Sequence, residues 1–314
     1  MEQYDVVIIG GGPAGLTAGI YTSRARLNTL ILETYLSPSQ ITLTDMIENY
    51  PGFPEGIKGM NLLQLMRKQA QNFGTEFKMG TVTGIEKKGK EWNIYLDDKS
   101  VISTLSVIVA TGAVAKELGV PGEKEYKGRG VSYCAVCDAP FFKDKEVAVI
   151  GGGDTAVEEA LYLTKFASKV YLIHRRDQLR ATKILQERVK SNTMVEIIWN
   201  SVVTEIKGKE KVNSIVLKNV KTEEKKELNV DGVFIFIGLI PQTDFIKGIV
   251  ELDENGYIKV DKEMRTTVEG IFAAGDCIQK NLRQVVTACG DGATAGYSAQ
   301  LYVEDLKGTG YKYR

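Results

Sequence analysis

The chain has 314 residues, 43% of them hydrophobic and 25% charged, which is the composition of an ordinary globular protein long enough for two domains. Lysine and arginine total 40, as do aspartate and glutamate, so the net charge is zero and gives no reason to expect nucleic acid or an anionic membrane as a partner. Four cysteines in this length are too few for a disulfide-stabilised secreted scaffold.

The N-terminal stretch MEQYDVVIIGGG has no basic region and only a short apolar run before the glycines. This pattern indicates a buried strand and not a signal peptide. No apolar run elsewhere approaches the roughly 20 residues that span a bilayer. We therefore expect a cytoplasmic protein without membrane association, in which a cysteine pair that forms a disulfide is catalytic and transient.

A glycine-rich pattern occurs twice. Residues 5–15 read DVVIIGGGPAG and residues 146–156 read EVAVIGGGDTA, each followed by a helical pattern. In G-x-G-x-x-G/A the first glycine permits a tight turn, the second lets backbone approach a pyrophosphate, and the small third residue lets the helix pack on the strand. Glycine turns that merely join strands to helices are the alternative. Two copies in strand–loop–helix context instead favour two dinucleotide sites.

The residue 23 positions after the first glycine of each loop indicates the nucleotide. Glu33 ends the strand TLILE, where a carboxylate accepts hydrogen bonds from ribose hydroxyls, as FAD would require. In the second copy, VYLIH ends at His174 and leads into Arg175 and Arg176. Arginine forks suit the 2′-phosphate of NADPH, and Arg180, expected on a helix, would close the same pocket. A solvated basic surface is the alternative.

The parts that follow each loop also match. Residues 80–100 and 200–220 both read as hairpins, and they lead to VIVATGA and VFIFIGLIP. A third strand–loop segment, GIFAAGDC, precedes a helical stretch over residues 286–306 and completes the first copy.

We predict an α/β fold of two Rossmann-like, three-layer dinucleotide-binding domains, with the NADPH domain inserted into the FAD domain. The predicted limits are 1–114 and 246–314 for the FAD domain and 117–243 for the NADPH domain.

The pair Cys134 and Cys137, followed at once by Asp138, lies just ahead of the second glycine loop. Two thiols at this spacing can form and open a disulfide with little motion, and the adjacent carboxyl group can carry a proton. A structural zinc site needs about four ligands, whereas Cys277 and Cys289 are isolated and the chain has one histidine. We therefore expect no metal, and we expect these two cysteines to be small buried residues.

These motifs together resemble those of the low-molecular-weight thioredoxin reductases of bacteria and archaea. The resemblance covers essentially the whole chain and rests on GGGPAG, IENYPGFP, VATGA, CAVCD, GGGDTAVEEALYL, HRRDQLRA, FIGLIP, AAGD and RQV. It implies a homodimeric flavoprotein that passes electrons from NADPH through FAD to its own dithiol and on to the disulfide of thioredoxin.

The resemblance also implies roles for individual residues. Cys134 would attack the partner disulfide, Cys137 would face the flavin, and Asp138 would protonate the leaving thiolate. The implied flavin contacts are Glu33, Gln40, Asn49, Asp276, Arg283 and Gln284, and the implied NADPH contacts are Thr155, His174, Arg175, Arg176 and Arg180. The motifs add Gly10, Gly12, Pro13, Ala14, Gly15, Thr111, Gly112, Gly151, Gly153, Asp154, Gly238 and Val285 to the predicted cofactor contacts.

Two departures from the family pattern stand out. Pro38 and Ser39 precede Gln40 where the family usually has two glycines, so the flavin loop is expected to follow a different path. Ala139 follows Asp138 where many relatives have glycine, a small change that should leave the helix after the dithiol intact.

The family relation implies that the NADPH domain rotates against the FAD domain, with hinges near 113–117 and 241–246. Other readings remain open: a reductase of a peroxiredoxin or of a glutaredoxin-like protein, a dithiol oxidase of small molecules, or a non-catalytic FAD-binding redox sensor.

Overall fold

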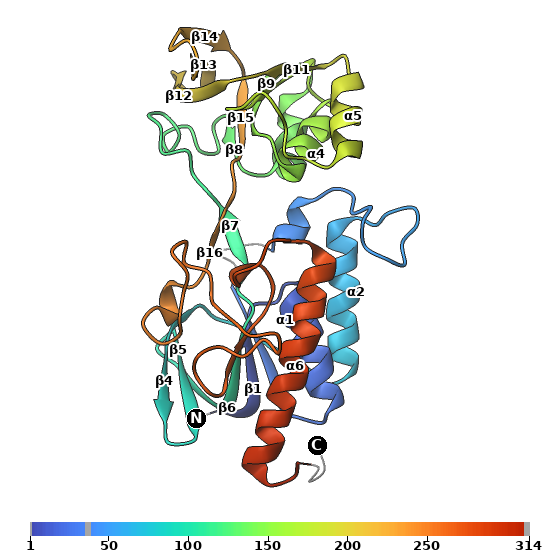
Figure 1. The fold of residues 1–314 in the computed structure, drawn as a ribbon, viewed down its shortest axis with the longest axis vertical. Helices are drawn as coiled ribbons and strands as arrows, with labels where there is room; N and C mark the ends of the chain where they lie inside the picture. The colour runs from blue at the N-terminus through green and yellow to red at the C-terminus, as the bar shows by residue number, and fades with distance from the viewer. Residues whose placement is uncertain (1, 35–38, 311–314) are drawn as a thin grey trace. The chain divides into compact units, whose positions relative to one another are not determined.

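The computed structural model describes residues 2–34 and 39–310, so Pro38 lies outside the described residues. The chain divides into two compact units, shown in Figure 1. The first unit consists of residues 1–114 and 240–314, and the second of residues 115–239.

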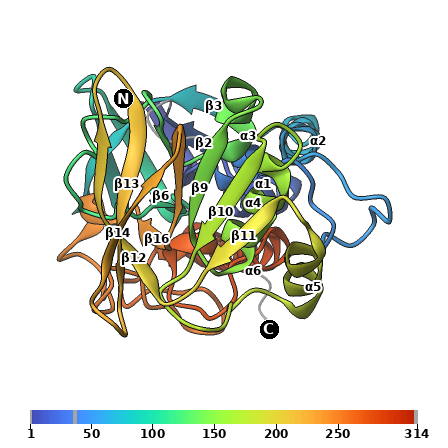
Figure 2. The ribbon, with the colours of Figure 1, turned by 90° about the horizontal axis from the view of Figure 1, so that it is seen from above.

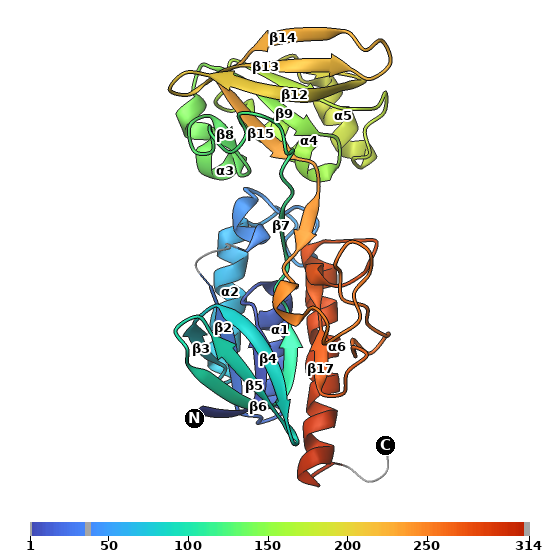
Figure 3. The same cartoon turned by 90° about the vertical axis from the view of Figure 1, so that its left-hand side faces the viewer.

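The first unit contains a parallel sheet with the strand order β3-β2-β1-β6-β17. The second half of β6 pairs with β17, while its first half pairs antiparallel with β5, which in turn pairs with β4 (Figure 3). The elements are β1 Glu2–Ile9, α1 Pro13–Arg24, β2 Thr29–Glu33, α2 Gly59–Asn72, β3 Glu76–Met79, β4 Val82–Lys88, β5 Glu91–Leu96, β6 Val101–Val109, β17 Ile271–Ala273 and α6 Val285–Lys307, with short 3₁₀ turns at Gln40–Leu43, Asp244–Ile246 and Gly275–Cys277.

Alternate side chains of the parallel strands face two different layers. Val6 and Ile8 of β1 pack in the core formed with α1, α2 and α6, whereas Val7 and Ile9 pack in the core that contains Ile94 of β5. Because both faces of these strands are buried, they appear in the sequence as continuous apolar runs. Helices, parallel sheet and antiparallel meander form three layers.

The second unit repeats this plan. Its parallel sheet has the order β11-β10-β9-β15-β8, and a separate antiparallel sheet has the order β12-β13-β14 (Figure 2). The elements are β8 Val131–Ser132, α3 Ala135–Asp138, a 3₁₀ turn at Ala139–Phe142, β9 Glu146–Gly151, α4 Asp154–Leu163, β10 Lys169–Ile173, α5 Lys183–Ser191, β11 Val195–Ile198, β12 Ser201–Gly208, β13 Val212–Asn219, β14 Lys225–Asn229 and β15 Gly232–Phe236.

The central strand β9 divides its side chains in the same way as β1. Val147 and Val149 pack in the core shared with α3, α4 and α5, and Ala148 and Ile150 pack in the core shared with β12 and β13. Both units therefore have the three-layer Rossmann-like architecture, and the predicted fold class is confirmed.

Each glycine loop is a tight turn from strand to helix. Gly10 has φ +117°, which side chains rarely adopt, and a Cβ at Gly15 would overlap the carbonyl oxygen of Gly10. In the second unit Gly151 has φ +156°, and a Cβ there would lie 2.5 Å from the Cβ of Ala156. The first turns of α1 and α4 therefore begin directly at the carboxyl ends of β1 and β9.

The two chain segments that join the units run side by side. β7 (Ala113–Ala115) and β16 (Leu239–Pro241) form a two-stranded ribbon. The backbone N–H of Lys116 donates to the carbonyl of Gly238 at 2.9 Å. Of the helices within the described residues, none combines the length and the apolar character that crossing a membrane requires.

Candidate active site

The predicted dithiol lies at the start of α3. Cys134 and Cys137 are joined by a disulfide, with their Cα atoms 5.4 Å apart. Cys134 is the N-cap of α3, and its Sγ accepts a hydrogen bond from the backbone N–H of Cys137 at 3.1 Å. Ser132 Oγ accepts from the backbone N–H of Cys134 at 3.0 Å, which holds the strand that leads into the pair. Asp138 ends α3, so its carboxyl group and the two thiols belong to one helical turn.

The second glycine loop follows the dithiol in the same unit. A Cβ at Gly152 would overlap the His174 ring, whereas a Cβ at Gly153 would meet nothing within 4 Å. His174 is buried, and its Nδ1 lies 2.9 Å from the carbonyl oxygen of Gly151. Burial lowers the pKa of His174, so the ring is neutral at pH 7. The ring packs directly against the backbone of Gly152. The open space in front of Gly153 is where a phosphate can approach the first turn of α4.

Three predicted arginines follow His174, whose ring contacts this loop. Arg175, Arg176 and Arg180 are exposed, and within the described part of the chain none of their side chains is in an ion pair. Arg180 lies in the loop before α5, not on a helix as predicted. The reason is that the backbone N–H groups of Arg180 and Ala181 donate to the carbonyl of Gly152, at 2.7 and 3.2 Å, and not to carbonyls of a helical turn.

Two of the remaining predicted residues of this unit directly follow the loop in the chain, and the third, Gly238, follows β15, whose Phe236 pairs with Gly151. Asp154 Oδ1 accepts from the backbone N–H of Thr182 at 2.6 Å and so ties the beginning of α5 to the beginning of α4. Thr155 is exposed on the first turn of α4. Gly238 has φ +127° and open space where a side chain would be.

A cavity of about 860 Å³ opens in the first unit at the carboxyl ends of β1 and β2. It is large enough for a cofactor. Gly15, Asn49 and Arg283 are outside its lining. The predicted residues that line the cavity are Gly10, Gly12, Pro13, Ala14, Glu33, Gln40, Thr111, Gly112, Asp276, Gln284 and Val285.

Glu33 reaches this cavity from the end of β2, and its carboxylate is already paired. Arg67 Nη1 donates to Oε1 and Oε2 of Glu33, both at 2.6 Å, and the Arg67 guanidinium stacks on Phe77 at 4.0 Å. A carboxylate has about four acceptor positions, so Glu33 can still accept from a ligand hydroxyl. No motif predicted Arg67, because it lies on α2, outside the motif segments.

Asp276 also lines the cavity. Its Oδ1 is buried and has no hydrogen-bond partner among the described residues, and burial raises the pKa of this carboxyl group. Such an atom is expected where a ligand supplies the missing donor. Nearby, Asn49 Nδ2 donates to Gln284 Oε1 at 3.1 Å, which joins two residues predicted separately. Arg283 instead packs on the Tyr257 ring, 4.0 Å from its centre.

Comparison with known proteins identifies the family. The chain matches the pyridine nucleotide-disulphide oxidoreductase model over residues 4–292. It belongs to this family. A thioredoxin reductase of Bacillus subtilis is 50% identical over 307 residues, which cover 98% of this chain and 96% of that protein. The crystal structure of Lactococcus lactis thioredoxin reductase is 49% identical with a TM-score of 0.94 and covers 96% of this chain and 100% of its own. That of the T. acidophilum enzyme is 36% identical, with a TM-score of 0.92 and coverages of 98% and 100%.

These identities over nearly the full length confirm the resemblance to the low-molecular-weight thioredoxin reductases. The roles of the individual site residues stay predictions, and the structure gives the positions and the hydrogen-bond partners of these residues.

A buried carboxylate that no motif predicted is hydrogen-bonded to the residue before the dithiol. Glu123 is 1% exposed and accepts three hydrogen bonds. They come from the backbone N–H groups of Leu118 and Gly119, at 2.8 and 2.6 Å, and from the Tyr133 hydroxyl at 2.7 Å. Tyr133 directly precedes Cys134, so Glu123 joins the segment after β7 to the segment that carries the dithiol. Glu123 lies in the charged stretch PGEKEYKGRG, which reads as solvated loop.

The two cysteines outside the dithiol are not in a disulfide. Cys277 is fully buried, burial raises its thiol pKa, and its Sγ donates to the carbonyl of Ala274 at 3.3 Å. Cys289 is partly buried, with the Tyr50 hydroxyl 3.8 Å from its Sγ.

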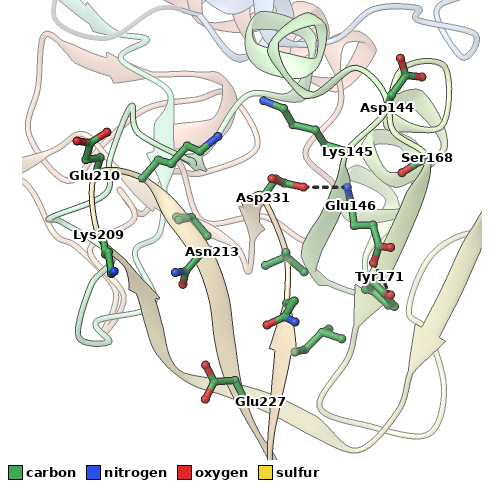
Figure 4. A pocket seen from close by; sticks show the side chains of 15 residues that line it. Asp144, Lys145, Glu146, Ser168, Tyr171, Lys209, Glu210, Asn213, Glu227 and Asp231 are labelled. Atoms are coloured by element: carbon green, nitrogen blue, oxygen red, sulfur yellow. Dashed lines mark hydrogen bonds between the residues drawn. The ribbon is translucent and has the colours of Figure 1, made fainter.

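A second cavity, of about 1040 Å³, contains none of the predicted site residues (Figure 4). It lies where β9 begins, at Glu146, and so at the opposite edge of the sheet from the glycine loop. Two hydrogen bonds join groups that line it: the Tyr171 hydroxyl donates to Glu146 Oε2 at 2.7 Å, and Asp231 accepts from the Glu146 backbone N–H at 3.3 Å. Ligands of open α/β sheets bind at the carboxyl ends of the strands, so we assign this cavity no role in the site.

The Glu123 network predicts an order of destabilisation. Replacing Glu123 with alanine leaves three donors unsatisfied and should lower the free energy of unfolding by about 3 kcal/mol, whereas Tyr133→Phe removes one bond and should cost about 1 kcal/mol. Urea unfolding monitored by circular dichroism measures both. Equal effects of the two variants would contradict the role assigned to the carboxylate.

Proposed function

We propose that this protein is an NADPH-dependent thioredoxin-disulfide reductase that uses FAD. The observation that carries the proposal is the Cys134–Cys137 disulfide, formed within one helical turn that ends in Asp138. It lies in the same unit as a glycine loop with unpaired arginines. Electrons from a nicotinamide and a dithiol that exchanges with protein disulfides account for both features.

The cavity of the first unit suits FAD. The first turn of α1 faces it with the Gly10–Gly12 backbone, which favours a pyrophosphate, and Glu33 can accept from a ribose hydroxyl. The Asp276 carboxyl group, which lines the cavity, offers an acceptor to a second hydroxyl. When bound, FAD supplies a carrier that accepts a hydride and passes on two electrons.

The loop of the second unit suits NADPH. Gly153 leaves room for a pyrophosphate at the first turn of α4. Arg175 and Arg176, whose guanidinium groups lack ion-pair partners within the described residues, supply charge and forked geometry for a 2′-phosphate.

The reduced dithiol then acts on the protein substrate. The Cys134 thiolate attacks one sulfur of the thioredoxin disulfide, which forms a mixed disulfide and releases one thioredoxin thiolate, protonated by Asp138. Cys137 attacks Cys134 Sγ, which re-forms the Cys134–Cys137 disulfide and releases the second thioredoxin thiol. Two electrons and two protons pass to thioredoxin in each cycle, and NADPH replaces the electrons.

The surroundings of the dithiol favour a protein substrate over a small molecule. Phe141 lies three residues after Asp138 and is 72% exposed. An aromatic side chain this exposed beside a reactive pair provides an apolar contact for a docked protein. A peroxiredoxin or a glutaredoxin-like protein is the alternative partner of the same chemistry.

We further propose that the chain forms a homodimer through the first unit. Tyr21 on α1 and Tyr297 on α6 are 40% and 46% exposed, and the two helices pack together, since a Cβ at Gly296 would lie 3.1 Å from the Tyr21 Cβ. Exposed apolar residues on adjacent helices favour association. The nicotinamide and the dithiol must use the same FAD in turn, so we also propose that the units rotate about hinges near 113–117 and 241–246.

The dithiol assignment predicts a separation of the two half-reactions. Cys134→Ser should abolish reduction of thioredoxin by NADPH, because the attacking thiolate is missing, while NADPH should still bleach the flavin absorbance. Cys289→Ala, outside the dithiol, should keep both activities. A Cys134→Ser protein that still reduces thioredoxin would contradict the assignment. Wild-type protein that reduces no protein disulfide would favour the redox sensor.

The arginine assignment predicts a loss of coenzyme selectivity. Replacing Arg175 and Arg176 with alanine removes two charge-assisted contacts and should raise KM for NADPH by roughly 10- to 100-fold. KM for NADH, which lacks the 2′-phosphate, should change little. Lys190→Ala, at an exposed position on α5, is the matched control for loss of surface charge. Similar increases for both coenzymes would refute the phosphate contact.

The docking role of Phe141 predicts an effect confined to the protein substrate. Phe141→Ala should raise KM for thioredoxin by about tenfold, because an apolar anchor is lost. Turnover of a small aromatic disulfide should be unaffected, and Phe141→Leu should restore part of the thioredoxin affinity. Equal loss with both substrates would mean that Phe141 supports the dithiol itself.

A further inference from the structure

A partly buried lysine lies between two carboxylates, one of which, Asp276, lines the cavity of the first unit. The Lys280 side chain is 13% exposed, and its Nζ lies 2.6 Å from Asp291 Oδ2 and 3.8 Å from Asp276 Oδ1. Asp276 belongs to the 3₁₀ turn Gly275–Cys277, whereas Asp291 is on α6. No motif predicted Lys280 or Asp291.

The two carboxylates have different surroundings. Asp291 Oδ2 accepts hydrogen bonds from Lys280 and from the backbone N–H of Gly275, at 2.6 and 3.2 Å. Asp276 lines the cavity, and its Oδ1 has no hydrogen-bond partner among the described residues. Arg283 leaves that oxygen free as well, since its Nε donates to the backbone carbonyl of Asp276 at 3.4 Å.

The difference between 2.6 and 3.8 Å decides what Lys280 does for each acid. At 2.6 Å the ammonium group is held by Asp291. At 3.8 Å it is too far from Asp276 for a hydrogen bond but close enough to stabilise a negative charge in a poorly solvated wall. Lys280 therefore favours the charged form of Asp276 without forming a hydrogen bond to it.

The charges around Asp276 support this division of roles. Burial raises the pKa of Asp276 and Asp291 adds to the effect, whereas Lys280 and then Arg283 act in the opposite direction. Without Lys280 the pKa of Asp276 would rise further. The carboxyl group would then take up a proton at a higher pH and lose the charged acceptor.

We propose that Lys280 is a positioning residue for the cofactor: held by Asp291, it keeps Asp276, which lines the cavity, ionised as an acceptor for a hydroxyl of FAD. The inference rests on the proposed function, because it takes FAD as the occupant of this cavity. It adds to that function the residue whose charge favours the ionised form of the Asp276 carboxyl group.

The test measures FAD release from the purified holoprotein by flavin fluorescence across a pH series. Lys280→Met should raise the FAD dissociation constant roughly 10- to 100-fold, the loss expected for one charge-assisted hydrogen bond. The weakening should grow as the pH falls and should begin at a higher pH than in wild type. Lys280→Arg should stay within a few-fold of wild type, and Lys262→Met, at a side chain that is 91% exposed, should change nothing.

A double-variant cycle separates positioning of Asp276 from a general structural effect. Asp276→Asn removes the charge on which Lys280 acts, so adding Lys280→Met to it should cause little further loss of FAD. The same loss in both backgrounds would overturn the proposal, as would Lys280→Met protein that binds FAD like wild type at every pH.

Two further measurements keep the outcomes distinct. If Lys280→Met does not fold, the Lys280→Met/Asp291→Asn protein removes both charges of the pair. Its FAD binding should be weaker than that of wild type and pH-dependent, although the loss of Asp291, which raises the pKa of Asp276, offsets part of the effect. Unchanged binding in that variant counts against the proposal. Wild-type protein that takes up no FAD would refute the proposed function itself, whereas wild-type protein that binds FAD while the variants match it refutes only the role of Lys280.

Discussion

The tight packing of a helix against the turn that precedes it is the constraint on which the rest of this structure depends. A side chain at Gly15 would overlap the carbonyl of Gly10, and in the second unit only a small residue fits at Ala156 beside Gly151. Because the helix begins so close to the strand end, its free backbone N–H groups face the space beyond the sheet. Both proposed nucleotide sites follow from this one backbone arrangement.

Around these turns, carboxylates with little exposure to solvent are each held by partners. Glu33 is held by Arg67, Asp291 holds Lys280 beside Asp276, and Glu123 accepts three hydrogen bonds beside the dithiol. A buried charge is costly unless it is paired or hydrogen-bonded, so each of these groups comes with partners. Asp276 departs from this pattern, since its Oδ1 lacks a hydrogen-bond partner within the described residues, and Asp276 lines the cavity where FAD is proposed to bind.

The two units share one architecture but differ in what surrounds the turn. The first has an acidic residue, Glu33, at the end of its second strand, and the second has exposed arginines after His174. The dithiol belongs to the second unit, in which Glu123 and Tyr133 tie it to the segment that follows β7. One fold thus carries two different chemistries because only the residues at its strand ends change.

Much of the molecule could be read from local patterns. The buried strands, the glycine turns, α6, the two hairpins and the CAVCD dithiol all depend on residues close together in the chain, so periodicity and motif spacing predicted them. Arg180 was misplaced on a helix because the carbonyl of Gly152, 28 positions earlier, decides its backbone conformation. No local pattern reports a partner that far away.

The same reason explains the residues that no motif predicted. Arg67 acts on Glu33 across 34 positions, and Lys280 reaches Asp291 from a loop onto α6. A charged residue in a polar stretch looks the same whether it is solvated or buried. The sequence by itself determined the fold class, the family and the identity of the dithiol, because these depend on local geometry. Tertiary structure alone decided which charges are buried, which are paired and which acceptor stays open, because those properties depend on groups that folding brings together.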